Sequence, residues 1–351
     1  MAIQYINNFE FEGKKVICRF DFNVPLDKDG KITDSTRIDS SLETIRFILE
    51  KGASKLVLMS HLGRPKGAPE KKYSLEPVAS YLADKLGQEV VLTESCLDRG
   101  IKTLMSLPET KIILLENLRF HKEEEANDHE FAKRLASYGD VYVNDAFGTA
   151  HRKHASTYGI NAFFKGKALA GFLLQKEILA LDKIVNNPAK PFVAVVGGAK
   201  VADKIKIIEE LLRSVDSLLI GGAMAYPFLK AKGIEVGKSL CGDDDVKLAK
   251  NILSKGVASK IRLPMDHIVA ENPDAVSNTT TGTSIDENMM GLDIGPVTLD
   301  SYSSIVTNAS TVLWNGPMGL FEKAAFNKGT FGLAKAIANS KAFSVVGGGA
   351  S

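Results

Sequence analysis

The chain has 351 residues, more than one hydrophobic core usually supports, so two domains of about 150 to 180 residues each are expected. Its 44 % apolar and 25 % charged residues are typical of a globular protein, and a formal net charge of +2 gives no reason to expect nucleic acid or a membrane as a partner. The three cysteines are scattered and lack any CxxC spacing, which argues against a disulfide framework or a zinc site. Neither a signal peptide nor an apolar run of about 18 residues occurs, so we expect a cytoplasmic protein.

Short apolar runs rich in β-branched residues alternate along the chain with longer segments of helical period. This alternation predicts an α/β fold of two doubly wound, Rossmann-like parallel sheets, each covered by helices on both faces. One repeat illustrates the pattern. Ser40, or Asp39 beside it, can cap a helix over residues 42–49, Gly52 ends that helix, and residues 55–60 form the next strand.

Polar and basic side chains follow the expected strands of the first half. Ligands of doubly wound sheets bind beyond the carboxyl ends of the strands, so these side chains mark a candidate site. Several cations in one crevice repel one another unless an anion lies among them, and arginine suits phosphate or carboxylate through paired donors. These side chains lie in residues 21–25, 61–65, 116–120 and 144–152, and Arg37 lies in a separate loop.

Other interpretations of these charges stay open. For any one arginine, an ordinary surface ion pair is the better interpretation. Five arginines, counting Arg19 at a strand end, favour a site, because function is expected where such placement repeats. The charge runs 122–125 and 243–245 are interpreted as solvated loops or helix starts without a function.

Residues 171–184 have the period of an amphipathic helix that ends before Pro188. The helix is either a hinge between two lobes or a helix buried in one of them, and the sequence alone favours neither.

The strand ends of the second half are rich in glycine. Pairs or triplets of glycine follow residues 192–196, 217–220 and 343–346, and Gly316 and Gly319 follow residues 311–314. Glycine lets the backbone approach a flat base or a phosphate, and it leaves amides at helix starts free for anions. This half is therefore the expected nucleotide lobe.

Lys200 and Lys204 stand at an expected helix start. The helix dipole disfavours cations there unless an anion intervenes, although a solvated helix face is the alternative.

Familiar nucleotide motifs are missing. No GxGxxG follows the first strand of a unit, which weakens the alternative of a dehydrogenase on a similar sheet. Residues 233–239 fail the Walker A spacing by one residue, and the HRD and DFG signatures of protein kinases do not occur.

The motifs together resemble those of the phosphoglycerate kinase family, in the right order from about Phe20 to Gly349. The matching segments are residues 21–25 (DFNVP), 33–37, 61–65 (HLGRP), 116–120 (ENLRF), 146–152, 197–204, 236–240, 292–296 and 314–322.

The resemblance implies a phosphoryl transfer between ATP and 3-phosphoglycerate in glycolysis, and the reverse transfer from 1,3-bisphosphoglycerate to ADP. It implies residues 1–170 as the 3-phosphoglycerate domain, 171–187 as a hinge helix and 188–351 as the nucleotide domain. The chain would be a monomer that needs Mg²⁺ with its nucleotide. The implied ligands of 3-phosphoglycerate are seven residues of the first half, Asp21, Asn23, Arg37, His61, Arg64, Arg119 and Arg152. The implied nucleotide contacts are Lys200, Lys204, Gly221, Gly295, Glu322, Gly347, Gly348, Gly349, Ala350 and Ser351.

The expected chemistry needs no general base. A substrate carboxylate is already ionised at neutral pH, so its attack on a γ-phosphoryl group needs positioning and charge neutralisation. Arg37, Lys200 and Gly349 are the expected catalytic residues, helped by Mg²⁺ and helix amides.

The resemblance breaks at the end of the sequence. Ala350 stands where the family has an aspartate that contacts the metal-nucleotide, and alanine cannot ligate a hard cation, so no metal ligand is predicted. The second hypothesis is therefore a catalytically impaired or truncated form that binds nucleotide and triose phosphate without efficient turnover. A third interpretation is a sequence in which an intervening stretch was omitted and its ends were joined.

Overall fold

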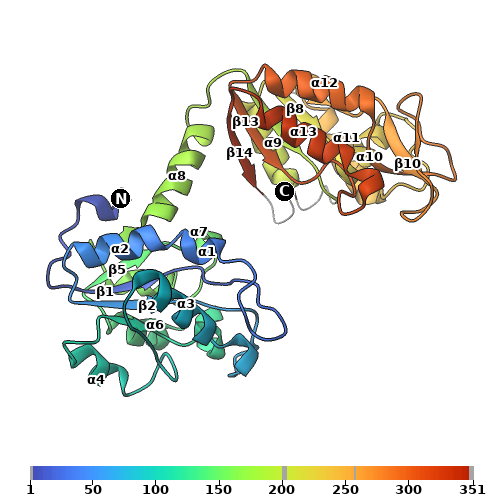
Figure 1. Ribbon diagram of the computed structural model, residues 1–351. Helices are drawn as coiled ribbons and strands as arrows, with labels where there is room; N and C mark the ends of the chain where they lie inside the picture. The colour runs from blue at the N-terminus through green and yellow to red at the C-terminus, as the bar shows by residue number, and fades with distance from the viewer. Residues whose placement is uncertain (1–2, 200–203, 257, 348–351) are drawn as a thin grey trace. The chain divides into compact units, whose positions relative to one another are not determined.

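The structure is a computed structural model, and it describes residues 3–199, 204–256 and 258–347 (Figure 1). The chain packs into two compact units, Met1–Leu179 and Ala180–Ser351. Each unit is built on its own parallel sheet.

The sheet of the first unit has six strands in the order β3-β4-β2-β1-β5-β6, and all the pairings among them are parallel. The carboxyl ends of its strands therefore lie along one edge. The strands are β1 (Lys15–Arg19), β2 (Lys55–Met59), β3 (Val90–Leu92), β4 (Ile112–Leu114), β5 (Val141–Asn144) and β6 (Ala168–Ala170).

Helices cover both faces of this sheet because successive strand residues point to opposite sides. Val16 and Cys18 of β1 pack in one core with Ile45 of α2, whereas Ile17 packs in the other core with Leu135 of α6. The helices are α1 (Thr36–Asp39), α2 (Leu42–Glu50), α3 (Glu76–Leu86), α4 (Ile101–Ser106), α5 (Lys122–Glu125), α6 (His129–Ala136) and α7 (Phe147–Ala150), with short 3₁₀ turns at η1 (Ile6–Asn8), η2 (Lys71–Tyr73), η3 (Leu118–Phe120) and η4 (Gly159–Phe163).

The predicted helix over 42–49 and the strand after it are confirmed as α2 and β2. Gly52 lies just past the helix with φ +79°, a conformation that glycine adopts without strain. The predicted cap is wrong. Asp39 and Ser40 belong to the end of the preceding short helix α1, where the Ser40 hydroxyl donates to the carbonyl of Thr36 (2.7 Å).

The second unit contains a five-stranded parallel sheet, ordered β14-β13-β7-β8-β9, and a small antiparallel sheet, ordered β11-β10-β12. The strands are β7 (Phe192–Val196), β8 (Ser217–Ile220), β9 (Ile261–Arg262), β10 (His267–Ala270), β11 (Asn278–Thr279), β12 (Met290–Ile294), β13 (Thr311–Asn315) and β14 (Phe343–Gly347).

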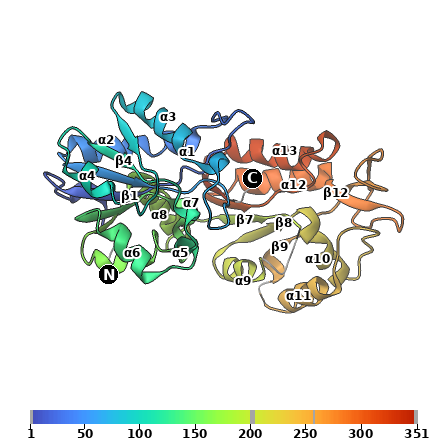
Figure 2. The same cartoon turned by 90° about the horizontal axis from the view of Figure 1, so that it is seen from below.

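Two helical layers sandwich the larger sheet of this unit (Figure 2). Val193 and Val195 of β7 pack with Val306 of α12, whereas Ala194 packs with Leu212 of α9 on the other face. The helices are α9 (Ile205–Ser214), α10 (Ala225–Ala231), α11 (Asp243–Leu253), α12 (Pro296–Thr307) and α13 (Lys328–Ala338), with 3₁₀ turns at η5 (Gly222–Met224), η6 (Ala258–Lys260) and η7 (Ala324–Phe326). The predicted fold class, two doubly wound α/β domains, is confirmed, and the antiparallel sheet is an addition to it.

Helix α8 (Phe172–Val185) contains the division between the two units. Its first turn is held within the first unit, where the carboxylate of Asp145 accepts from the amide of Leu174 (2.9 Å) and Thr44 Oγ1 accepts from the amide of Phe172 (3.0 Å). A Cβ at Gly171 would lie 2.4 Å from Asp145 Cγ, so the close approach needs glycine. Among the helices of the described ranges, none combines the length and the apolar character that a membrane crossing requires.

Candidate functional site

Arg19, the last residue of β1, lies at the centre of the polar edge of the first unit. Its side chain is 1 % exposed, and its Nε donates to Ser156 Oγ (2.9 Å) while its Nη1 donates to the carbonyl of Phe20. Its Nη2 lies 3.1 Å from His61 Nδ1. Because a guanidinium group can only donate, Nδ1 of His61 is an acceptor and the ring proton sits on Nε2.

His61 is surrounded by cations. Burial lowers its pKa well below the usual range, and the charges of Arg19, Arg119, Arg152 and Arg37 lower it further. The imidazole is therefore a neutral hydrogen-bond donor at physiological pH. Four of the predicted strand-end and loop arginines thus lie close enough to act on one side chain.

Two of these arginines have buried N–H groups without a hydrogen-bond partner in the described chain. Arg119 is 4 % exposed; its Nη1 donates to the carbonyl of Gly63 (2.9 Å), and its Nε lies 3.3 Å from Glu125 Oε1. Within the described chain, Nη2 of Arg119 and Nε of Arg152 are enclosed and have no hydrogen-bond partner. Burial lowers the pKa of Arg119, and Arg152 and Arg19 add to this effect. Buried, mutually repelling guanidinium groups with unused donors are suited to a phosphate or carboxylate.

Asp21, Asn23, Arg37 and Arg64 surround this cluster. Arg37 Nη1 forms an ion pair with Asp21 Oδ2, although the Arg37 side chain is 53 % exposed. Asn23 Oδ1 accepts from the amide of Gly63 (2.7 Å), next to Arg64, whose side chain is exposed. The seven residues predicted for the first half therefore lie along one sheet edge.

Glu124 corrects the interpretation of the charge run 122–125 as solvated. It is 1 % exposed, and its carboxylate accepts from the amide (2.9 Å) and the hydroxyl (2.6 Å) of Ser156. That hydroxyl also accepts from Arg19, so Glu124 and Arg19 are joined through one serine. Burial lowers the pKa of Arg19, and the negative charge of Glu124 opposes this shift. Glu124 is thus a buried counter-charge of the arginine cluster.

In the second unit, the glycine turns after β7, β8 and β13 pack directly on one another. The amide of Gly197 donates to Asn315 O (2.9 Å), that of Gly198 to Pro317 O (3.0 Å) and that of Gly222 to Met318 O (2.9 Å). A Cβ at Gly197 would lie 2.0 Å from Pro317 O. These glycines were predicted to serve a close approach to a ligand, and several of them are already required by the neighbouring turn.

A cavity of about 360 Å³ opens above these turns and is mostly apolar. Its walls include two predicted features, the glycine turns and Glu322, together with the ring of Tyr226. The described residues that line it are Gly198, Ala199, Gly222, Ala223, Tyr226, Leu240, Pro273, Met290, Gly291, Leu292, Pro317, Gly319, Leu320 and Glu322. A mostly apolar cavity lined by glycine turns is suited to a nucleobase.

Other predicted nucleotide residues lie beside this cavity rather than in its described lining. Lys204 Nζ donates to the carbonyls of Gly197 (2.8 Å) and Asn315 (3.2 Å), which ties it to two of the turns. A Cβ at Gly221 would meet the sulfur of Met318 at 2.4 Å, so Gly221 serves turn packing. Gly295 precedes α12 and packs against Asp266.

The remaining predicted nucleotide residues are Lys200, which follows β7 in the sequence, and residues 347–351. Gly347 is the last residue of β14 and is paired with Asn315 of β13. Lys200, Gly348, Gly349, Ala350 and Ser351 lie outside the described residues. Within the described ranges, no group of three or more His, Cys, Asp or Glu side chains is arranged to hold a metal ion.

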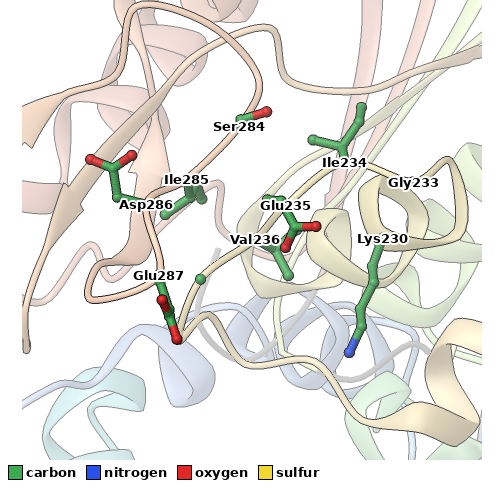
Figure 3. A pocket seen from close by; sticks show the side chains of 10 residues that line it. Lys230, Gly233, Ile234, Glu235, Val236, Ser284, Ile285, Asp286 and Glu287 are labelled. Atoms are coloured by element: carbon green, nitrogen blue, oxygen red, sulfur yellow. The ribbon is translucent and has the colours of Figure 1, made fainter.

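A larger hollow of about 640 Å³ lies elsewhere in the second unit (Figure 3). It is formed by the end of α10 and two loops, residues 233–237 and 284–287. Glu235, Asp286 and Glu287 give it three carboxylates against the single cation of Lys230. This charge balance is unsuited to a polyphosphate, and the hollow contains no predicted nucleotide residue.

The comparisons with known proteins agree with the geometry. The protein-family model described as Phosphoglycerate kinase matches residues 6–351. The chain belongs to the phosphoglycerate kinase family. A relative named phosphoglycerate kinase from Anaeromyxobacter dehalogenans (strain 2CP-1 / ATCC BAA-258) is 52 % identical over an alignment of 356 positions that covers 99 % of this chain and 89 % of the relative. Another, from Chloroherpeton thalassium, is 48 % identical with the same coverage.

Solved structures of the family have the same fold. The phosphoglycerate kinase of Coxiella burnetii is 42 % identical, with a TM-score of 0.87 over 99 % of this chain and 88 % of that chain. The enzyme of Pyrococcus horikoshii OT3 is 35 % identical, with a TM-score of 0.81 over 99 % and 89 %. The resemblance that the sequence motifs indicated is therefore confirmed.

The sequence did not single out several polar residues near the carboxyl ends of the strands in the first unit. Asn117 lies three residues after β4 and Asp145 directly follows β5, so the rule that directed attention to strand ends could have included them. Glu124 and Ser156 carry no comparable signal, because they are 32 positions apart and neither ends a strand.

Proposed function

We propose that this chain transfers a phosphoryl group between ATP and 3-phosphoglycerate, and from 1,3-bisphosphoglycerate to ADP in reverse, as an ATP:3-phosphoglycerate 1-phosphotransferase of glycolysis. The observation that carries the proposal is the arginine cluster around His61, with enclosed and unused donors on Arg119 and Arg152. A small molecule that has both a carboxylate and a phosphate ester provides the anionic acceptors that such a cluster requires. Membership in the family makes 3-phosphoglycerate the first ligand to test.

The reaction in this proposal needs no proton abstraction. The attacking carboxylate is ionised at neutral pH, so the residues of the chain have to bind, orient and neutralise. His61 contributes an uncharged Nε2–H donor, whereas Arg119 and Arg152 contribute charged donors. Arg37 is half exposed and paired with Asp21, so it is available to a group that approaches from solvent. We assign it, with Lys200 and Gly349, to the phosphoryl group in transfer.

The nucleotide in this proposal lies over the glycine turns of the second unit, with its base in the apolar cavity. Glu322 is an acceptor at the wall of that cavity and is suited to a ribose hydroxyl. Lys204 lies at the turns and would face the phosphates, as would Lys200. Mg²⁺ enters as part of the substrate, carried on the phosphate oxygens of ATP or ADP.

The proposal includes a division of labour between domains. Residues 1–170 would bind the triose phosphate, residues 188–351 the nucleotide, and 171–187 would act as a hinge helix whose bending brings the ligands together and excludes water. We also propose that the protein is a cytoplasmic monomer.

A coupled assay that measures formation of 1,3-bisphosphoglycerate from 3-phosphoglycerate and MgATP tests the proposal. Calorimetric titration of each ligand runs beside it. Turnover that requires both ligands and Mg²⁺ is the expected result. Binding of both ligands without turnover would instead leave a binding protein, and absence of 3-phosphoglycerate binding would overturn the proposal.

A further inference from the structure

Asn117, three residues after the end of β4 at Leu114, is 1 % exposed and forms hydrogen bonds with three segments of the first unit. Its Nδ2 donates to the carbonyls of Leu62 (2.7 Å) and Tyr73 (2.9 Å). Its Oδ1 accepts from the amide of Arg119 (3.0 Å). All three hydrogen-bonding partners are main-chain groups, so the side chain sets backbone position.

The orientation of this amide is fixed by its partners. Carbonyl oxygens can only accept, so the group that faces Leu62 and Tyr73 is the NH₂ group. The amide of Arg119 can only donate, so it faces the oxygen. A carboxylate of the same shape could satisfy Arg119 but would oppose both carbonyls.

The two carbonyls bracket the loop that follows β2. This loop contains Gly63 and Arg64, and it begins directly after His61. Gly63 O accepts from Arg119 Nη1 (2.9 Å), and Gly63 N donates to Asn23 Oδ1 (2.7 Å). Asn117 thus holds the loop at both ends while it also holds the backbone from which Arg119 reaches the loop.

Close packing makes the position of this loop sensitive to its anchor. Gly63 has φ +62°, and a Cβ there would lie 2.3 Å from the ring of Tyr73. Tyr73 itself is anchored by Asn117, and Ser74 donates to the buried carboxylate of Glu116 (2.7 Å). Release of Tyr73 would therefore move the wall against which Gly63 is packed.

We propose that Asn117 is a positioning residue of the triose phosphate site: through three main-chain hydrogen bonds it sets the distance between the loop of residues 62–73, which contains Gly63 and Arg64, and Arg119. The inference rests on the proposed function, because the positioning role of Asn117 is measured by the affinity for 3-phosphoglycerate. Asn117 acts through these neighbours and has no direct part in the chemistry.

The test is Asn117→Asp, a nearly isosteric change that removes the two N–H donors. The Michaelis constant and the calorimetric Kd for 3-phosphoglycerate should rise by at least about tenfold, because two buried carbonyls lose their partners. The Michaelis constant for MgATP should stay within about twofold, since Asn117 belongs to the first unit. A merely structural role would lower thermal stability and leave the Michaelis constant for 3-phosphoglycerate unchanged.

Asn161→Asp is a control that makes the same chemical change at an exposed asparagine. Asn161 Nδ2 also donates to two carbonyls, those of Thr157 (2.7 Å) and Tyr158 (3.0 Å), but its partners do not carry the substrate loop. This control should bind 3-phosphoglycerate as the unmodified chain does. If Asn117→Asp does not fold, Asn117→Ala replaces it, because alanine removes the donors without adding a charge.

The outcomes separate the two claims. Equal 3-phosphoglycerate affinity in the Asn117 and Asn161 variants would overturn the positioning role while the unmodified chain still turns over. A parallel rise in the Michaelis constants of both substrates would overturn it as well. If the unmodified chain neither binds nor converts 3-phosphoglycerate, the proposed function fails first and the inference fails with it.

Discussion

Replacement of Gly197 by alanine would drive a methyl group into the backbone of the turn after β13. The new carbon would lie 2.0 Å from Pro317 O, 2.7 Å from Gly316 O and 2.7 Å from Met318 Cε. Carbon atoms make their best contacts at about 3.5–4 Å, so the two turns have to separate by more than about 1 Å. Main-chain atoms cannot rotate away as a flexible side chain can. The substitution therefore has to move the turns themselves.

The cost has two parts. Overpacking of a tight interior costs about 1–3 kcal/mol. Separation of the turns also weakens the hydrogen bonds from Gly197 to Asn315 and from Gly198 to Pro317, at about 1 kcal/mol each. A loss near 3 kcal/mol should lower the Tm of a unit of this size by about 6–12 °C. The same movement distorts the turn beneath the apolar cavity, so the Michaelis constant for MgATP should rise.

Thermal unfolding followed by circular dichroism measures the first effect, and the coupled assay measures the second. Gly282→Ala is the matched control, because a Cβ there meets nothing within 4 Å. The reasoning is refuted if Gly197→Ala unfolds at the temperature of the control and keeps the affinity of the unmodified chain for MgATP.

Three further predictions test the buried charges. Glu124→Ala should destabilise the chain by about 3 kcal/mol, because it removes the counter-charge of the buried Arg19 and the acceptor of both polar groups of Ser156, whereas Glu123→Ala should change denaturant stability little. Arg119→Lys should weaken 3-phosphoglycerate binding by at least about tenfold in calorimetry, because a lysine cannot reproduce the fork that reaches both Gly63 and a ligand. Burial raises the pKa of Asp293 to about 7. The stability that this group contributes is therefore present below its unfolded pKa of about 4 and is lost as the pH rises through 7. Asp293→Asn should reduce the dependence of the unfolding free energy on pH, as measured by urea titrations between pH 5 and 8.

The arginine cluster could be predicted because it follows from topology alone. Parallel strands place their carboxyl ends along one edge, so Arg19, Arg119 and Arg152 had to converge once their strands were recognised. Which of their donors would stay unpaired depends on contacts between distant segments. The hydrogen bond from Arg19 to Ser156 joins residues 137 positions apart, and the sequence around neither residue predicts it.

The charge run at 122–125 shows where sequence reasoning fails. Consecutive acidic residues usually indicate a solvated helix face, and Glu123 and Glu125 fit that pattern. Glu124 is buried because residues 154–156 fold back over α5, with the amide of Ala155 on the carbonyl of Glu124 (2.9 Å) and Ser156 on its carboxylate. Only the tertiary partner distinguishes one glutamate from its neighbours.

Glycine presents the same difficulty in the second unit. A glycine pair after a strand predicts a close approach but does not say what approaches. At Gly197 and Gly221 the approaching group is the turn after β13, whereas Gly198 and Gly222 both line the cavity and pack on that turn. The sequence predicts a nucleotide lobe without distinguishing glycines that serve a ligand from glycines that serve the fold.

Helix starts in both units are already occupied by aspartate side chains. Three buried aspartates accept amides from first turns: Asp145 from Leu174 of α8, Asp266 from Val297 and Thr298 of α12, and Asp293 from Gly329 of α13. These amides are in use, so a ligand phosphate at any of the three helix starts would have to displace the aspartate. The proposed anion donors of the first unit are therefore its guanidinium groups, and the affinity for 3-phosphoglycerate should fall as each of these arginines is replaced.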